Sequence, residues 1–243
     1  MKAVLRWFFV LLLAMLALQL FFVARIALMA VTDPQSTTFE RSEAWRILAE
    51  KDTLRWRQRW VDYAQISDHL KRAVIASEDD SFAWHEGVDW DALEKAWQKN
   101  TAAEERAAQL AAKGARTVRP PKIVGGSTIT QQLAKNLLLS GERTLLRKGQ
   151  ELVLAYLLEK LLSKQRILEL YLNHVEWGEG VFGAEAAAQH YYRKPAARLS
   201  ADEAARLAVM LPRPRHYEKL PNSPYLADRA SVIAGRLWRA ELP

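Results

Sequence analysis

Cysteine is absent from the 243-residue sequence. Its absence excludes disulfide bonds, cysteine-ligated zinc and thiol nucleophiles, and it neither requires nor forbids an oxidising compartment. The five histidines include no pair at metal-ligand spacing on a helix. The sequence therefore indicates no metal site built from cysteine or paired histidine ligands, and we assign no metal-ligating residue.

Long strand patterns and phosphate-binding loops are also missing. Apolar and polar residues alternate over no more than a few positions, and there is no internal repeat. Glycines 178, 180 and 183 lie close together, but no Lys-Ser or Lys-Thr pair follows them and no predicted strand precedes them. The glycine-rich turn therefore fits neither a P-loop nor a dinucleotide-binding turn. The apolar residues recur instead at helical spacing, which predicts a mainly α-helical protein.

The composition favours one globular domain with an anionic partner. A hydrophobic content of 50% is enough to bury a core, and 35 basic against 28 acidic residues give a net charge of +7. Such a charge favours nucleic acid, phospholipid or a phosphorylated substrate, and composition does not choose among the three.

The N-terminus carries a candidate membrane span. Residues 7–24 are free of charge, and residues 26–31 continue the apolar run beyond Arg25. Eighteen helical residues rise ~27 Å, close to the hydrocarbon thickness of a bilayer. A cleaved signal peptide is the alternative, but the run exceeds a typical signal-peptide core and contains no Ala-x-Ala triplet.

Flanking charge predicts the orientation of this span. Lys2 and Arg6 precede it, whereas the fifteen residues after Arg25 contain no lysine or arginine. This asymmetry favours a cytoplasmic N-terminus, with the rest of the chain outside the cytoplasm. We therefore divide the chain into residues 1–31 (cytoplasmic tip and membrane helix), 32–60 (linker and membrane-proximal segment) and 61–243 (globular domain).

The membrane-proximal segment mixes three tryptophans with five arginines, at positions 45, 56 and 60 and positions 41, 46, 55, 57 and 59. In a soluble protein this mixture would suggest nucleic acid. So close to a membrane span it favours contact with lipid headgroups, and ordinary core and surface use is equally compatible.

Residues 125–136, GGSTITQQLAKN, gather polar groups at the start of a predicted helix. Thr128 and Gln131 have capping-box spacing, so the helix is expected to begin at Ser127 or Thr128. Thr128, Gln131 or Gln132, and Lys135 follow at steps of three and four and share one face. That face suits a ligand, and a capped surface helix with solvated polar residues is the alternative.

A second helix, predicted from residue 66 to 81 with Ser67 as its N-cap, ends in Glu78-Asp79-Asp80. Carboxylates at a helix C-terminus interact unfavourably with the helix dipole. Ordinary solvated surface residues are therefore a poor explanation for three acidic residues at this helix end. Repulsion and partial burial would raise the pKa of one of them, as a general acid or base requires. The local sequence does not indicate which one.

Further helices are predicted at residues 89–112, 163–173, 184–192, 201–211 and 227–240, with Asp89 and Ser163 as N-caps. Residues 114–126 form a basic, proline-containing loop. On the helix that follows the central one, Glu151 lies four residues after Arg147 and three after Lys148, which by itself favours an intrahelical ion pair.

Taken together, these motifs resemble a known family. They are RAVIASEDDSFAWHEGVD at 72–89, GGSTITQQLAKN at 125–136, RKGQE at 147–151, RILELYLN at 166–173 and GEGVFGAEAAAQHYY at 178–192. In order and spacing they resemble the glycosyltransferase domain that polymerises peptidoglycan from lipid II, and specifically the monofunctional biosynthetic peptidoglycan transglycosylases. The resemblance implies a lysozyme-like, two-lobed helical domain after one transmembrane helix.

The resemblance also implies roles for individual residues. Glu78 would be the general base on the acceptor 4-hydroxyl, and Glu151 would assist departure of the lipid pyrophosphate, directly or through a divalent cation such as magnesium or manganese. The substrate-binding residues implied by the family are Ser127, Thr128, Gln131, Gln132, Lys135, Asn136, Arg143 and Lys148. Leu138 and Tyr192 stand where the family often has phenylalanine, and neither departure touches an implied catalytic position.

The function implied is inverting synthesis of β-1,4 glycan from lipid II at the bacterial inner membrane, with the catalytic domain in the periplasm and undecaprenyl pyrophosphate released. The expected partners are lipid II, the growing glycan strand and the membrane, together with proteins of cell-wall synthesis and division, and no nucleic acid. Two alternatives stay open: a membrane-anchored lytic transglycosylase or lysozyme-like enzyme, and a non-enzymatic scaffold that binds anionic polymers.

Overall fold

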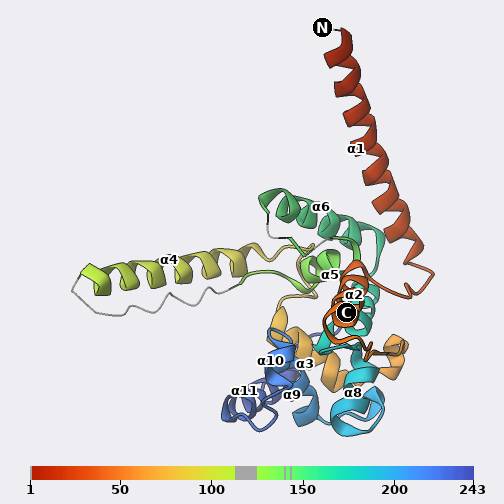
Figure 1. The fold of residues 1–243 in the computed structure, drawn as a ribbon. Helices are drawn as coiled ribbons and strands as arrows, with labels where there is room; N and C mark the ends of the chain where they lie inside the picture. Colours follow the sequence, from red (N-terminus) through yellow and green to blue (C-terminus); the bar gives the residue numbers. More distant parts are fainter. Residues whose placement is uncertain (1, 113–124, 140, 143) are drawn as a thin grey trace.

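A computed structural model of the chain describes residues 2–112, 125–139, 141–142 and 144–243. The described residues are mainly helical, as predicted (Figure 1). The helices are α1 (Lys2–Leu28), α2 (Thr38–Lys51), α3 (Asp68–Glu78), α4 (Trp90–Ala112), α5 (Ile129–Leu138), α6 (Leu145–Leu161), α7 (Lys164–His174), α8 (Ala184–Tyr192), α9 (Ala201–Met210), α10 (Pro214–Tyr217) and α11 (Pro224–Ala234).

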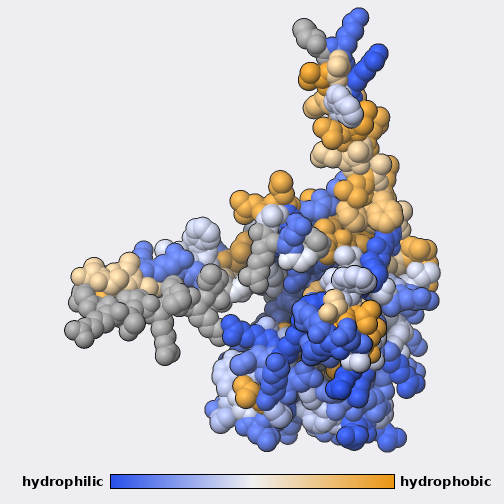
Figure 2. Space-filling view, in the orientation of Figure 1, coloured by the Kyte–Doolittle hydropathy of each residue, from blue (hydrophilic) through white to orange (hydrophobic). Residues whose placement is uncertain are grey.

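Helix α1 projects from the body of the protein (Figure 1). Its most apolar eighteen-residue window is only 6% buried, and its length and composition suffice to cross a membrane. Figure 2 shows this apolar surface standing above a largely hydrophilic body. The helix is fixed to the body at its C-terminal half, where Gln19 and Gln150 exchange amide hydrogen bonds of 3.1 and 3.2 Å. Arg166 of α7 donates to the carbonyl of Met29, just after α1.

The core is one continuous set of apolar side chains shared by two helical groups. Helix α5 contacts α2, α6 and α7, and α3 packs against α9 and α11. The hydrophobic side of α5 is buried as its period predicts, with Ile129, Leu133 and Leu137 at 0–1% exposure. Helix α4, by contrast, extends away from the body and buries only Ala96 (Figure 1).

The membrane-proximal segment contains α2, an element that the sequence pattern did not indicate. Thr37 caps it through a complete capping box with Glu40. Glu40 is itself buried, and its carboxylate lies 2.7 Å from Nδ1 of His174 on α7. The tryptophans of this segment divide: Trp56 stacks on Phe182 with ring centroids 4.5 Å apart, whereas Trp45 is exposed.

A small sheet joins this segment to the glycine-rich turn. Strands β1 (Arg57–Gln58), β2 (Glu176–Gly178) and β3 (Val181–Phe182) lie in the order β1-β3-β2, with β1 parallel and β2 antiparallel to β3. Strands of two or three residues are too short to produce an alternating pattern, so the sequence did not reveal them. Gly180 has a φ of +71°, and a Cβ there would lie 2.1 Å from the carbonyl oxygen of Arg55. The turn therefore requires glycine.

Most helix boundaries agree with the sequence, but the helix predicted over 66–81 already ends at Glu78, where Asp79 leaves the helical conformation, and the C-terminal helix also differs. Ser67, Thr128 and Ser163 each cap a helix through their hydroxyl groups. The helix predicted over 227–240 is displaced: α11 begins at Pro224 and ends at Ala234, and residues Leu237–Arg239 form a 3-10 turn. Proline at the first helical position explains the early start, because its fixed φ suits a helix and its missing N–H is not needed there.

Candidate active site

The end of α3 separates its three carboxylates. Glu78 is half-buried, Asp79 is buried and Asp80 is exposed. Glu78 is the last residue of α3, and Asp79 follows as its C-cap with a non-helical φ of −164°, so the three side chains leave the helix end in different directions and meet different surroundings. The burial difference assigns them different roles.

Asp79 joins α3 to the N-terminus of α5. Its Oδ2 accepts a 2.8 Å hydrogen bond from the backbone N–H of Ile129. Nε2 of His85 lies 2.9 and 3.0 Å from the two carboxylate oxygens. Because the N–H of Gly87 donates to Nδ1 of His85, the imidazole proton is on Nε2 and points at Asp79. A carboxylate at a helix N-terminus is stabilised by the helix dipole, so Asp79 serves as a structural link.

Glu78 has a raised pKa. Burial raises its pKa, the neighbouring Asp79 raises it further, and a hydrogen bond from Gln132 opposes the change. That bond joins Nε2 of Gln132 to Oε2 of Glu78 at 3.0 Å. The hydroxyl of Tyr171 donates to Oε1 of the same Gln132 at 3.0 Å, which turns the amide N–H groups toward Glu78.

Glu151 forms the centre of a second charged cluster. It is only 3% exposed on α6. Its Oε2 lies 2.6 Å from Nη1 of Arg147, and its Oε1 pairs with Nζ of Lys148. The intrahelical ion pairs suggested by the spacing are therefore present. Lys148 also contacts Oγ of Ser127 and Oε1 of Gln131, both at 3.2 Å.

Helix α5 connects the two clusters. Gln132 contacts Glu78, and its neighbour Gln131 reaches Glu151 through Lys148. A cavity of about 510 Å³ opens between the end of α3, the start of α4 and the turn before α5. Glu78 and Ser127 line it, whereas Glu151 and Lys148 do not. The arrangement provides a carboxylate with raised proton affinity on one side of the first turn of α5 and a cationic group on the other.

Comparisons with known proteins identify the family. The transglycosylase family profile matches residues 46–237. A protein named biosynthetic peptidoglycan transglycosylase in Burkholderia thailandensis is 55% identical over 95% of this chain and 84% of its own length. Proteins of the same name in Burkholderia pseudomallei and Burkholderia orbicola are 53% and 52% identical over the same share of this chain and cover 84% and 87% of their own lengths.

The chain belongs to the transglycosylase family. This confirms the family indicated by the motifs, together with an enzymatic glycosyltransferase and the lysozyme-like helical fold. The match begins within α2 and so excludes α1.

The remaining predicted substrate-binding residues of this transglycosylase differ in accessibility. Thr128 and Gln131 are 2% and 3% exposed, and the Thr128 hydroxyl is engaged by the N–H of Gln131 and the carbonyl of Gly87. Lys135 is exposed and Asn136 is half-buried on the last turns of α5. Arg143 and most of the basic loop, residues 113–124, lie outside the described residues.

Two positioning residues of the transglycosylase site were not assigned from the sequence. His85 fixes Asp79, and Tyr171 fixes Gln132. The signal for Tyr171 was its place on the apolar face of the predicted helix 163–173, since a buried tyrosine hydroxyl needs a partner. Its partner, Gln132, belongs to another helix, so the sequence around Tyr171 could not reveal its positioning role.

Proposed function

We propose that this transglycosylase polymerises peptidoglycan glycan strands from lipid II, by inverting transfer with release of undecaprenyl pyrophosphate. The observation that carries the proposal is the pairing of a half-buried carboxylate of raised pKa, Glu78, with a cationic cluster across the first turn of α5. A glycan-cleaving enzyme also needs the carboxylate, but its substrate has no pyrophosphate for the cations to bind.

Glu78 acts as the general base. It takes the proton of the acceptor sugar 4-hydroxyl as that oxygen attacks the anomeric carbon of the donor. The bond between the anomeric carbon and the pyrophosphate oxygen breaks on the opposite face, which inverts the α-linked donor to a β-1,4 glycan. A carboxylate whose pKa is raised accepts a proton more readily near neutral pH than an ordinary one.

The cationic groups stabilise the leaving pyrophosphate. Lys148 is half-buried and faces Ser127 at the turn before α5, where the helix N-terminus also favours an anion. Glu151 acts through Arg147 and Lys148, whose head groups it holds in place. Negative charge that develops on the phosphate then meets donors already oriented toward it. Lys135, Asn136 and Arg143 would extend this surface along the lipid diphosphate.

A divalent cation held by Glu151 does not fit the described residues. Both Glu151 oxygens are engaged by cationic side chains. Among the described residues no group of three or more histidine, aspartate or glutamate side chains could hold a metal. Any magnesium or manganese would therefore enter with the pyrophosphate oxygens, and no step above depends on it.

The membrane anchor supports a location at the bacterial inner membrane, with the domain in the periplasm. Helix α6 exposes Leu145 and Leu146 at 92% and 89%, and Figure 2 shows apolar atoms of α6 on the side from which α1 rises. Apolar side chains there would lie next to the bilayer that holds the lipid substrate.

The decisive experiment supplies two substrates separately to the detergent-solubilised full chain. Labelled lipid II should be converted into polymer, and finished glycan strands should remain intact. Cleavage of finished strands without polymer from lipid II would refute the proposal and support a lytic enzyme. Magnesium, manganese and EDTA arms of the same assay would measure metal dependence.

A further inference from the structure

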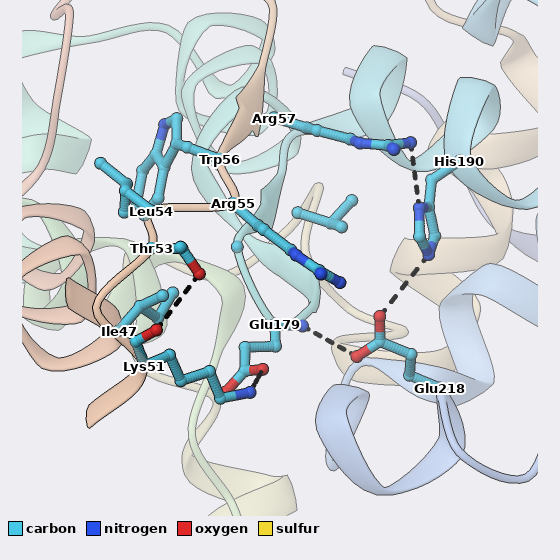
Figure 3. A pocket seen from close by; sticks show the side chains of 12 residues that line it. Ile47, Lys51, Thr53, Leu54, Arg55, Trp56, Arg57, Glu179, His190 and Glu218 are labelled. Atoms are coloured by element: carbon cyan, nitrogen blue, oxygen red, sulfur yellow. Dashed lines mark hydrogen bonds and ion pairs between the residues drawn. The ribbon is translucent and has the colours of Figure 1, made fainter.

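A second cavity, of about 700 Å³, lies apart from the active-site cavity and shares no lining residue with it. It opens between the C-terminal end of α2, strand β1, the turn between β2 and β3, and helix α8 (Figure 3). Its charged lining consists of Lys51, Arg55, Arg57, Glu179 and Glu218. Nothing in the proposed polymerase reaction uses these groups.

Both carboxylates of this cavity already have partners. Glu179 is paired with Lys51 and with Arg46, whose Nη2 is 3.3 Å from Oε1. Glu218 accepts a 2.9 Å hydrogen bond from the backbone N–H of Glu179. It also lies 3.5 Å from Nε2 of His190. Both carboxylates are thus held by hydrogen bonds or ion pairs, but only Glu179 is paired with cationic side chains.

Arg57 faces a neutral group. Its Nη1 lies 3.2 Å from Nδ1 of His190, an arrangement that requires Nδ1 to be an unprotonated acceptor (Figure 3). Burial lowers the pKa of His190, and the positive charge of Arg57 also lowers it against the opposing effect of Glu218. The imidazole is therefore neutral at physiological pH and leaves the charge of Arg57 uncompensated.

Arg55 supplies a second available cation. Its side chain extends into the cavity in Figure 3, and among the described residues it makes no hydrogen bond or ion pair. Its backbone is held in place because Gly180 approaches its carbonyl oxygen more closely than any residue with a Cβ could. Two guanidinium groups, at the first residue of β1 and two residues before it, thus lack a carboxylate partner.

The rest of the lining limits the ligand. Ile47, Leu54, Trp56 and Val181 provide an apolar wall, and the volume suits a ligand of a few hundred daltons. With His190 neutral, three cationic and two anionic side chains leave one net positive charge. This balance favours a monoanion with an apolar body over a phosphate dianion, which Glu179 and Glu218 would repel.

We propose that this cavity binds the carboxylate end of a short peptide, with Arg55 and Arg57 as its carboxylate-binding groups. The planar guanidinium matches a carboxylate in a two-point contact. Glu218, which has no lysine or arginine partner, offers an acceptor to a peptide N–H group, and the apolar wall contacts the peptide side chains. The site is independent of the transfer reaction, so it can be tested without lipid II.

The test is calorimetric titration of the full chain in detergent micelles with acetyl-Ala-Ala, with the same dipeptide as its C-terminal amide, and with inorganic phosphate. We expect saturable binding of the acid and at least ~10-fold weaker binding of both the amide and phosphate, since charge-assisted hydrogen bonds dominate the contact. Equal binding of acid and amide, tighter binding of phosphate, or no saturable binding of the acid would each overturn the proposal.

Variants locate the site. Arg55→Gln should weaken binding of the acid ~10-fold or more, because it removes the uncompensated charge. Arg59→Gln is the matched control, since Arg59 is also an exposed arginine on the same segment but lies outside the cavity lining. Glu78→Gln should bind the dipeptide as the wild type does, which separates this cavity from the active site. Unchanged binding in Arg55→Gln, or equal losses in Arg55→Gln and Arg59→Gln, would contradict the assignment.

Discussion

Replacing Gln132 with methionine should make the transglycosylase selectively less active at low pH. Gln132 donates to the Glu78 carboxylate at 3.0 Å and thereby opposes the increase of its pKa caused by burial and Asp79. Methionine keeps the size of the side chain and removes both amide donors. The pKa of Glu78 should rise further, and the base should be protonated over a wider pH range.

The size of the effect follows from the lost bond. A hydrogen bond to a charged group contributes ~1.5 to 3 kcal/mol. Glu78 is half-buried, so water can partly replace the donor, and the lower end applies. About 1.5 kcal/mol corresponds to ~10-fold in the ionised fraction of Glu78. On the acid limb of the pH profile, where Glu78 is mostly protonated, kcat/KM of the variant should therefore be ~10-fold lower than that of the wild type. On the plateau at higher pH the difference should be much smaller.

The assay is the pH profile of kcat/KM with labelled lipid II, measured in parallel for Tyr171→Phe. The phenylalanine variant keeps the Gln132 donors but frees the amide to rotate, so its acid limb should move in the same direction by less. An equal loss for Gln132→Met at every pH would show that Gln132 only binds substrate. An acid limb displaced to lower pH would refute the electrostatic reasoning.

Three further predictions concern the base, the phosphate surface and the glycine-rich turn. Glu78→Gln should reduce lipid II turnover by ~10²-fold or more, and near wild-type turnover would exclude Glu78 as the base. The raised pKa of Glu78 destabilises the fold progressively as the pH rises from the ordinary value of a glutamate to the raised value, and fully above it. The variant should therefore also melt higher at neutral pH. Lys135→Ala should weaken binding of a phosphoglycolipid inhibitor while changing the free energy of unfolding by no more than ~0.5 kcal/mol, and Lys135→Arg should rescue the affinity in part. Unchanged affinity would make Lys135 a solvated surface residue, and a large fall in Tm would make it a structural one. Gly180→Ala should lower Tm, because the new Cβ would lie 2.1 Å from the Arg55 carbonyl oxygen. Gly149→Ala is the control: it lies in open space within α6 and should stabilise the protein by up to ~1 kcal/mol. An unchanged Tm in Gly180→Ala would contradict the close approach.

The sequence by itself determined the helices that begin with a local signal. Ser67, Thr128 and Ser163 cap the helices predicted for them, and the uncharged run after Arg6 forms the exposed helix α1. Capping and the helical period depend on residues three or four apart, so a single segment contains the information. The order of the motifs and the family resemblance were likewise available from the sequence alone.

Tertiary structure decided the surroundings of each carboxylate at the end of α3. Glu78 and Asp79 are adjacent in sequence, yet one meets Gln132 and the other meets His85 and the N–H of Ile129. Those partners come from other segments, and burial depends on how α3 and α5 pack, which no local pattern specifies.

The sheet and the second cavity also depended on packing. Strands as short as β1 and β3 are defined by their pairing, because two residues show no period. In the sequence, Arg55 and Arg57 are only two residues of a basic tract. The structure shows that they line a cavity together with His190 and Glu218. Charge compensation is a property of neighbours in space, so only the folded chain shows which cations remain available to a ligand.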